Sequence, residues 1–166
     1  PSPSYSRKDS SLIELSRSLF DVWTFGLFGF AAVRMKPGFG PGIAREITVK
    51  VTADMCPAFD GVVVHRVYAT WSVAHHFEIA ARKVLVDFLE EHEEAVGSHV
   101  SVDHFAPCPM GRIVRVRAEL VEVQSDHHVR VVCDLTAHDG ERLLARGRQV
   151  QVVMNKEHLK RYIERS

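Results

Sequence analysis

The sequence lacks the features of a disulfide-rich, zinc-binding or nucleic-acid-binding protein. Its three cysteines, Cys56, Cys108 and Cys133, are an odd number and show no CxxC spacing. This pattern argues against a disulfide framework or a zinc knuckle and is typical of a reducing compartment, so we expect a cytoplasmic protein with buried thiols. The formal net charge is zero with histidine neutral, so no excess of positive charge points to a nucleic-acid partner or an anionic membrane.

The sequence also lacks an apolar run of the roughly 20 residues that a membrane-spanning helix needs, so no membrane span is expected. The nearest candidate, residues 19–33, is interrupted by one aspartate and two glycines. We interpret residues 1–34 as an N-terminal extension that is partly disordered or an amphipathic helix on the surface of the domain or of a partner subunit. A signal-peptide core, and an upstream extension ahead of a natural start at Met35, stay open as alternatives.

Residues 35–166 have the size of one domain, and 46% apolar and 25% charged residues are ordinary globular values. Apolar and polar residues recur with a period of two in several segments, which predicts half-buried strands. These segments are residues 45–52, 98–106, 112–124, 127–139 and 141–154. Asp139-Gly140 is a hairpin signal between the last two strands, and Gly147 predicts a bulge or the close approach of another backbone.

One long helix is predicted between the first strand and the others. From Trp71 to about Glu94, apolar residues recur at spacings of three and four, which is the period of an amphipathic helix with a wide buried face. Gly97 is placed to end this helix, and residues 156–165 predict a small polar helix at the C-terminus. The order of elements indicates an α+β fold, with one helix packed on a curved antiparallel sheet.

Thr70, Glu78 and His104 form the best candidate for a chemical group in this sequence. A hydroxyl, a carboxylate and an imidazole are the parts needed for acyl transfer by activated water or by covalent catalysis. Each also has a structural interpretation: a helix cap, a solvated helix charge and a satisfied strand histidine. The neighbours His75 and His76 face about 100° apart on a helix and cannot chelate one ion from it, so no metal is expected.

The order of elements resembles the hot-dog fold, in which an antiparallel sheet wraps one long central helix. More narrowly, Ala69-Thr70, Phe77-Glu78, Gly97 and residues 102–111 (VDHFAPCPMG) are similar to motifs of the fluoroacetyl-CoA thioesterase group, including its V-x-H-x-A-x-x-P-x-G pattern. Residues 137–140, AHDG, resemble a turn of the same group. The likeness runs from about Met35 to the C-terminus and leaves out the N-terminal extension.

The resemblance implies that Thr70, Glu78 and His104 are the catalytic residues of an acyl-CoA thioesterase, which hydrolyses a small or medium acyl-CoA to free acid and CoA. It also implies a homodimer or a dimer of dimers whose sheets pair edge to edge, with CoA as part of the substrate and no further cofactor. Two alternatives stay open: a hot-dog acyl-CoA hydratase or dehydratase, and a non-catalytic acyl-CoA-binding module.

Three further positions are implied to bind substrate. Gly97 corresponds to a glycine that lets acyl or pantetheine atoms approach the backbone. Val64, together with Gly61, stands where the group has lid phenylalanines, and Gln151 stands where it has an arginine. These departures make fluoroacetyl-CoA itself an unexpected substrate and leave acyl-thioester hydrolysis intact.

Overall fold

The computed structural model describes residues 33–125 and 128–165. Residues 33–166 form one compact unit. The disorder or surface helix expected of residues 1–34 therefore lies almost entirely outside the described residues, and the expected domain boundary at Met35 stays a prediction.

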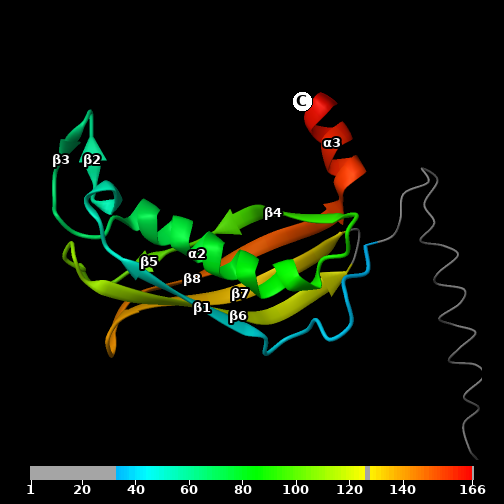
Figure 1. Ribbon diagram of the computed structural model, residues 1–166, viewed down its shortest axis with the longest axis horizontal. Coiled ribbons are helices and arrows are strands. Elements are labelled where there is room, and N and C mark those ends of the chain that lie inside the picture. The colour runs from blue at the N-terminus through cyan, green and yellow to red at the C-terminus, as the bar shows by residue number, and fades with distance from the viewer. Residues whose placement is uncertain (1–32, 126–127, 166) are drawn as a thin grey trace, which may run out of the picture. The chain divides into compact units, whose positions relative to one another are not determined.

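One curved antiparallel sheet makes up most of this unit (Figure 1). Its strands are β1 (Ala44–Lys50), β4 (Glu93–Val100), β5 (Asp103–His104), β6 (Ile113–Ser125), β7 (Val129–Asp139) and β8 (Arg142–Asn155). They are ordered β1-β6-β7-β8-β4, and the short β5 also pairs with β8. The antiparallel pairs β6-β7 and β7-β8 confirm the hairpins predicted from the alternating sequence, including the turn at Asp139-Gly140.

The alternation along the strands separates an inner from an outer face of the sheet. On β6, Val116 and Ala118 are completely buried, whereas Arg115 between Val114 and Val116 is exposed. β7 continues the inner face in register, because Val116 pairs with the equally buried Ala137. The sheet therefore has one apolar face, which needs a cover.

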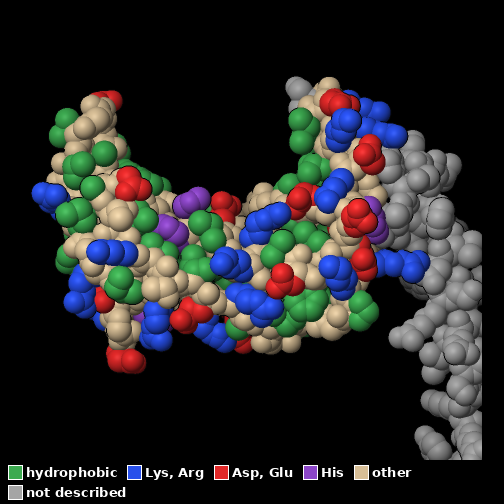
Figure 2. All heavy atoms as spheres, in the orientation of Figure 1, with side chains coloured by type: hydrophobic (Ala, Val, Ile, Leu, Met, Phe, Trp, Pro, Cys, Tyr) green, Lys and Arg blue, Asp and Glu red, His purple; other side chains and the backbone are tan. Residues whose placement is uncertain are grey.

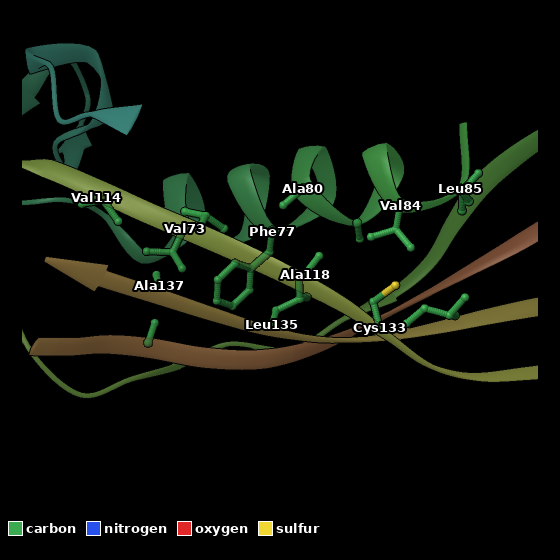
Figure 3. Close-up of a cluster of buried hydrophobic side chains, with 14 of the residues drawn as sticks. Val73, Phe77, Ala80, Val84, Leu85, Val114, Ala118, Cys133, Leu135 and Ala137 are labelled. Carbon is green, nitrogen blue, oxygen red and sulfur yellow. The ribbon is translucent and has the colours of Figure 1, made fainter. Parts of the chain in front are cut away.

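Helix α2 (Thr70–Leu85) covers that face. Its buried residues recur at the three- and four-residue spacing of a single stripe: Ser72, Val73, His76, Phe77, Ala80, Ala81, Val84 and Leu85. Figure 3 shows Phe77 and Val84 pointing from the helix toward Ala118, Leu135 and Cys133 of the sheet. Burying one side chain of the size of Phe77 stabilises the fold by about 1.5–3 kcal/mol.

The predicted end of the helix near Glu94 is wrong. α2 ends at Leu85, a 3-10 turn follows at Val86–Phe88, and Glu93 already begins β4. The Glu93 side chain is 1% exposed, and its carboxylate accepts hydrogen bonds from three main-chain N–H groups. This buried acceptor and the pairing of β4 with β8 outweigh the local helical period of the segment, as tertiary contacts commonly do.

The two glycines singled out by the sequence differ in outcome. Gly97 does not end the helix as expected but lies inside β4, opposite Gln151 of β8. The close approach predicted at Gly147 is confirmed, because a Cβ there would overlap the carbonyl oxygen of Ser101 and lie 3.0 Å from the Phe77 ring. A side chain at residue 147 would therefore displace the segment that joins β4 to β5.

Two small elements project from opposite ends of the sheet (Figure 1). One is the hairpin of β2 (Ala58–Phe59) and β3 (Val62–Val63). The other is α3 (Lys156–Arg165), which confirms the predicted C-terminal helix, and whose first N–H groups include one that donates to Oδ1 of Asn155. Within the described ranges, no helix combines the length and the apolar character needed to cross a membrane.

Candidate active site

Thr70 and His104 meet at the N-terminal end of α2. Thr70 is the first residue of the helix, its N-cap is Ala69, and no side chain caps it, so the interpretation of Thr70 as the cap is wrong. The Thr70 Oγ1 instead lies 3.1 Å from Nδ1 of His104, which pairs in β5 with Ala145 of β8. Thr70 is exposed and His104 is half-buried. An accessible hydroxyl backed by an imidazole can exchange a proton with a bound carbonyl group.

The second ring nitrogen of His104 faces inward. Its Nε2 is buried and has no hydrogen-bond partner in the described part of the chain, so the ring reaches the site through Nδ1. With its proton on Nε2, the ring accepts a hydrogen bond from the Thr70 hydroxyl at Nδ1; with its proton on Nδ1, it donates a hydrogen bond to Oγ1. The second tautomer leaves the hydroxyl proton of Thr70 available for another acceptor.

Glu78 lies about two helical turns further along α2, where its carboxylate reaches β4. Its Oε1 accepts a hydrogen bond from Nε2 of Gln149 at 3.4 Å. The same oxygen lies so close to Gly97 that a Cβ on this glycine would be 3.0 Å from it. Glu78 remains exposed as a residue. A carboxylate that is held by one oxygen and still accessible can serve as a base or as a nucleophile.

The described chain presents these residues as two half-sites. The first, called here the threonine half-site, is Thr70 with His104; the second, the glutamate half-site, is Glu78 with Gly97 and Gln149. Eight positions along a helix correspond to about 12 Å of axial rise and about 80° of rotation. Thr70 contacts His104 and Glu78 contacts Gln149, so each half-site has its own hydrogen-bond partner at a different place along α2.

A buried polar cluster fixes the start of α2. The Tyr68 hydroxyl lies 2.6 Å from Nδ1 of His76 and donates to the carbonyl oxygen of Ser72 at 3.3 Å. Burial lowers the pKa of His76 and raises the pKa of Tyr68, so both side chains stay neutral near pH 7. The Ser72 hydroxyl donates to the carbonyl oxygen of Met55 in the 3-10 turn η1 (Ala53–Met55). This cluster positions the helix end that carries Thr70.

The cysteines do not supply a nucleophile. All three are free and buried, as the sequence predicted. Burial raises the pKa of Cys108, which lies beside Tyr68 near the threonine half-site, and raises the pKa of Cys133 to about 11. Since the thiolate is the reactive form, these buried thiols are poorly suited to act as nucleophiles.

The other predicted contacts lie at either end of the site. Val64 follows the β2-β3 hairpin and is 52% exposed. Gln151 is 3% exposed, and its Nε2 donates to Oε1 of Gln149 at 3.2 Å. Gln149, the donor to Glu78, was missed by the sequence analysis. Its signal is an amide at an inward position of β8, where the alternation predicts an apolar residue.

The described residues contain no group of three or more His, Cys, Asp or Glu side chains placed to hold a metal ion. The His75 and His76 rings lie 5.3 Å apart, but His76 is turned into the cluster with Tyr68 while His75 is exposed.

Comparison with known proteins points to the same part of the chain. The fluoroacetyl-CoA-specific thioesterase family matches residues 51–157. A hypothetical protein of Thermus thermophilus, a thioesterase superfamily member, is 32% identical over 78% of this chain and 93% of that chain, with a TM-score of 0.73. A point mutant of the fluoroacetyl-CoA-specific thioesterase FlK is 24% identical over 78% of this chain and 98% of that chain, with a TM-score of 0.69. A hot-dog-like protein from Thermanaerovibrio acidaminovorans is 23% identical over 76% and 92%, with a TM-score of 0.70. No curated protein matches the chain.

The matched segment contains both half-sites and the whole of α2. The sheet curved around that helix is the hot-dog fold that the sequence predicted, and the same fold is found in the similar structures. The chain therefore belongs to the fluoroacetyl-CoA-specific thioesterase family and is a thioester hydrolase.

Proposed function

We propose that the enzyme hydrolyses the thioester of a small or medium acyl-CoA to a free acid and CoA, with Thr70, Glu78 and His104 as its catalytic residues. The contact of 3.1 Å between Thr70 Oγ1 and His104 Nδ1 carries this proposal, because it places an accessible proton donor at a helix start whose first N–H groups have no partner within the helix. FlK has been captured with acetyl-CoA and with fluoroacetate and CoA. Val64 and Gln151 depart from the group pattern, so fluoroacetyl-CoA itself is not the proposed substrate.

Two routes fit the proposed roles. In the first, Glu78 takes a proton from water, the resulting hydroxide attacks the carbonyl carbon, and the C–S bond breaks as the CoA sulfur takes up a proton. In the second, the Glu78 carboxylate attacks, CoA leaves as a thiolate, and water then hydrolyses the mixed anhydride. In either route the Thr70 hydroxyl and the helix N–H groups stabilise the oxyanion, and His104 exchanges a proton through Nδ1.

The proposal includes a homodimer, alone or within a dimer of dimers, as the functional unit. Two observations support it. Thr70 and Glu78 of one chain are about 12 Å apart along the axis of α2, and β4, which carries Gly97 beside Glu78, is the last strand of the sheet among the described residues. Figure 2 shows a hollow between the β2-β3 hairpin and α3, with histidine and acidic side chains on its floor. A second copy at the edge of β4 would lie next to the glutamate half-site.

Substrate contacts are proposed on both sides of the reacting carbonyl. Gly97 leaves room for acyl or pantetheine atoms beside Glu78, and Val64 lines the acyl side near Thr70. Gln151 is 3% exposed, so it would affect a substrate indirectly, through its hydrogen bond to Gln149.

The cytoplasm is the proposed location, because the three free cysteines suit a reducing compartment.

The test is release of free thiol from a panel of acyl-CoAs of increasing chain length. Wild type is compared with Thr70→Val, Glu78→Gln and His104→Asn. Glu122→Gln is the matched control, since Glu122 also accepts a hydrogen bond from a glutamine amide, that of Gln124, but on the exposed outer face of the sheet.

We expect at least one acyl-CoA to be hydrolysed and Glu78→Gln to lower kcat by about 100-fold or more, the size of a lost acid–base group, with the Glu122→Gln control unchanged. Hydration of an enoyl-CoA without thiol release would contradict this proposal and support the hydratase function. CoA-ester binding without turnover, indifferent to Glu78→Gln, would replace it by the binding module.

A further inference from the structure

We propose that Gln149 is a positioning residue that holds the Glu78 carboxylate for reaction, and that Gln151 fixes Gln149 in turn. This inference rests on the proposed function of Glu78. It assigns a role to an amide chain that joins β8 to α2 and whose members are far apart in the sequence: Gln151 donates to Gln149 at 3.2 Å, and Gln149 donates to Glu78 at 3.4 Å.

The direction of this chain follows from the chemistry of its two ends. An ionised carboxylate only accepts hydrogen bonds, so the NH₂ end of Gln149 must face Glu78. The Oε1 of Gln149 then faces Gln151, whose NH₂ group donates to it. Turning the Gln149 amide by 180° would break both contacts at once, so Gln151 holds Gln149 in the orientation that Glu78 requires.

Both amides are buried in the protein interior and are not exposed surface groups. Gln149 is 2% exposed and Gln151 is 3% exposed, on a sheet face where the neighbouring inward residues Ala145 and Val153 are completely buried. An amide placed at such a position costs free energy unless its hydrogen bonds are made. A purely structural strand would place an apolar side chain at both positions.

Gly97 completes the arrangement from the other side of Glu78. A Cβ on Gly97 would lie 3.0 Å from Oε1 of Glu78 and 3.5 Å from Nε2 of Gln149. The glycine therefore leaves room for the carboxylate to lie against β4 while Gln149 tethers Oε1. In the described residues Gln149 is the only hydrogen-bond partner of Glu78, so Oε2 is left to act on water or on the thioester.

The experiment compares two substitutions of Gln149 with one matched control. Gln149→Met keeps the length of the side chain and removes the donor, and Gln149→Glu replaces the donor by a second carboxylate close to Glu78. The control is Gln124→Glu, because Gln124 donates to Glu122 at 2.9 Å on the exposed face of the sheet. For each protein, kcat and KM are measured from pH 5 to 9, and the carboxyl carbon of residue 78 is titrated by ¹³C NMR, with Glu78→Gln as the assignment standard.

We expect Gln149→Met to lower kcat by about 10- to 100-fold, the cost of a misplaced reacting group, with KM changed far less. In Gln149→Glu, two neighbouring carboxylates resist simultaneous ionisation. The acid limb of kcat/KM and the NMR titration midpoint of residue 78 should therefore both move to higher pH. The Gln124→Glu control should superimpose on wild type in both measurements.

The proposal is overturned if Gln149→Glu titrates at residue 78 as wild type does, or if Gln149→Met folds and keeps full kcat. The NMR titration does not depend on turnover, so it decides the positioning role even if no acyl-CoA is hydrolysed and the proposed function fails. Thermal unfolding of both variants separates a loss of folded protein from a loss of positioning.

Discussion

If each active site combines the threonine half-site of one subunit with the glutamate half-site of its partner, two inactive variants should restore each other. We consider a heterodimer of one Thr70→Val chain and one Glu78→Gln chain. One of its two sites receives both substitutions and is dead. The other receives the intact Thr70 of the Glu78→Gln chain and the intact Glu78 of the Thr70→Val chain, and is unaltered.

The expected size of the recovery follows from this counting. In a two-fold symmetric dimer, the heterodimer should have about half of the wild-type kcat with an unchanged KM. Each homodimeric variant should retain about 1% or less, if a catalytic group is lost from both sites. The contrast between the heterodimer and its parents is then roughly 50-fold, far above the error of a thiol-release assay.

The assay uses two affinity tags, one on each chain, and tandem purification of the co-expressed heterodimer. The control is a heterodimer of Thr70→Val with His104→Asn. These residues belong to the same half-site, where Oγ1 and Nδ1 lie 3.1 Å apart within one chain, so each of the two sites carries one substitution and no recovery is expected.

Two outcomes would refute the reasoning. If the Thr70→Val and Glu78→Gln heterodimer stays as inactive as its parents, each site is built within one chain, and α2 must rearrange by more than the geometry described above. If the control with His104→Asn also recovers half of the activity, Thr70 and His104 act in different sites, and the contact between them is not the catalytic one.

Three further predictions concern the fold that carries the site. Glu93→Gln should lower the free energy of unfolding in urea by about 2 kcal/mol or more. The reason is that a buried carboxylate that accepts three main-chain N–H groups becomes an amide with one acceptor oxygen. An unchanged midpoint of urea unfolding would contradict this prediction. Burial lowers the pKa of His76 below its ordinary value of 6.5, so the unfolded chain binds more protons and stability should fall as the pH drops below about 6.5. In His76→Gln this contribution to the dependence of stability on pH should disappear. If the dependence persists in the variant, it belongs to another group. Gly147→Ala should cost about 2 kcal/mol in thermal or urea unfolding, because its Cβ would overlap the Ser101 carbonyl, whereas a wild-type midpoint would mean that the Ser101 segment moves freely.

Much of the fold was readable from the sequence because its signals are local. The alternation in β6, β7 and β8, the Asp139-Gly140 turn and the polar C-terminal helix each depend on neighbouring residues, and the structure confirms them. The end of α2 was not readable in this way. The segment around Glu93 has a helical period, but its place in β4 depends on residues of β8 about 60 positions away.

The residues of the candidate site also differ in whether a local sequence signal reveals them. Thr70, Glu78 and His104 were selected for their residue types and for the agreement of their spacing with the family motifs. The structure places Thr70 and His104 3.1 Å apart, and the catalytic roles of the three residues stay predictions. Gln149 was missed because its partner Glu78 is 71 residues away, and nothing in the local sequence ties an amide in a strand to a carboxylate on a helix. The useful local sign was an inward polar residue in a strand that is otherwise apolar on that face.

A site shared between two subunits would also explain why Thr70 and Glu78 lie on one helix. If a two-fold axis crosses two antiparallel copies of α2 midway between Thr70 and Glu78, the Thr70 of each copy faces the Glu78 of the other, and both sites form at once. That midpoint is Ala74, a small and half-buried residue, and small side chains let two helices approach closely. The axial separation of about 12 Å between Thr70 and Glu78 is then the spacing that lets two identical chains complete two sites.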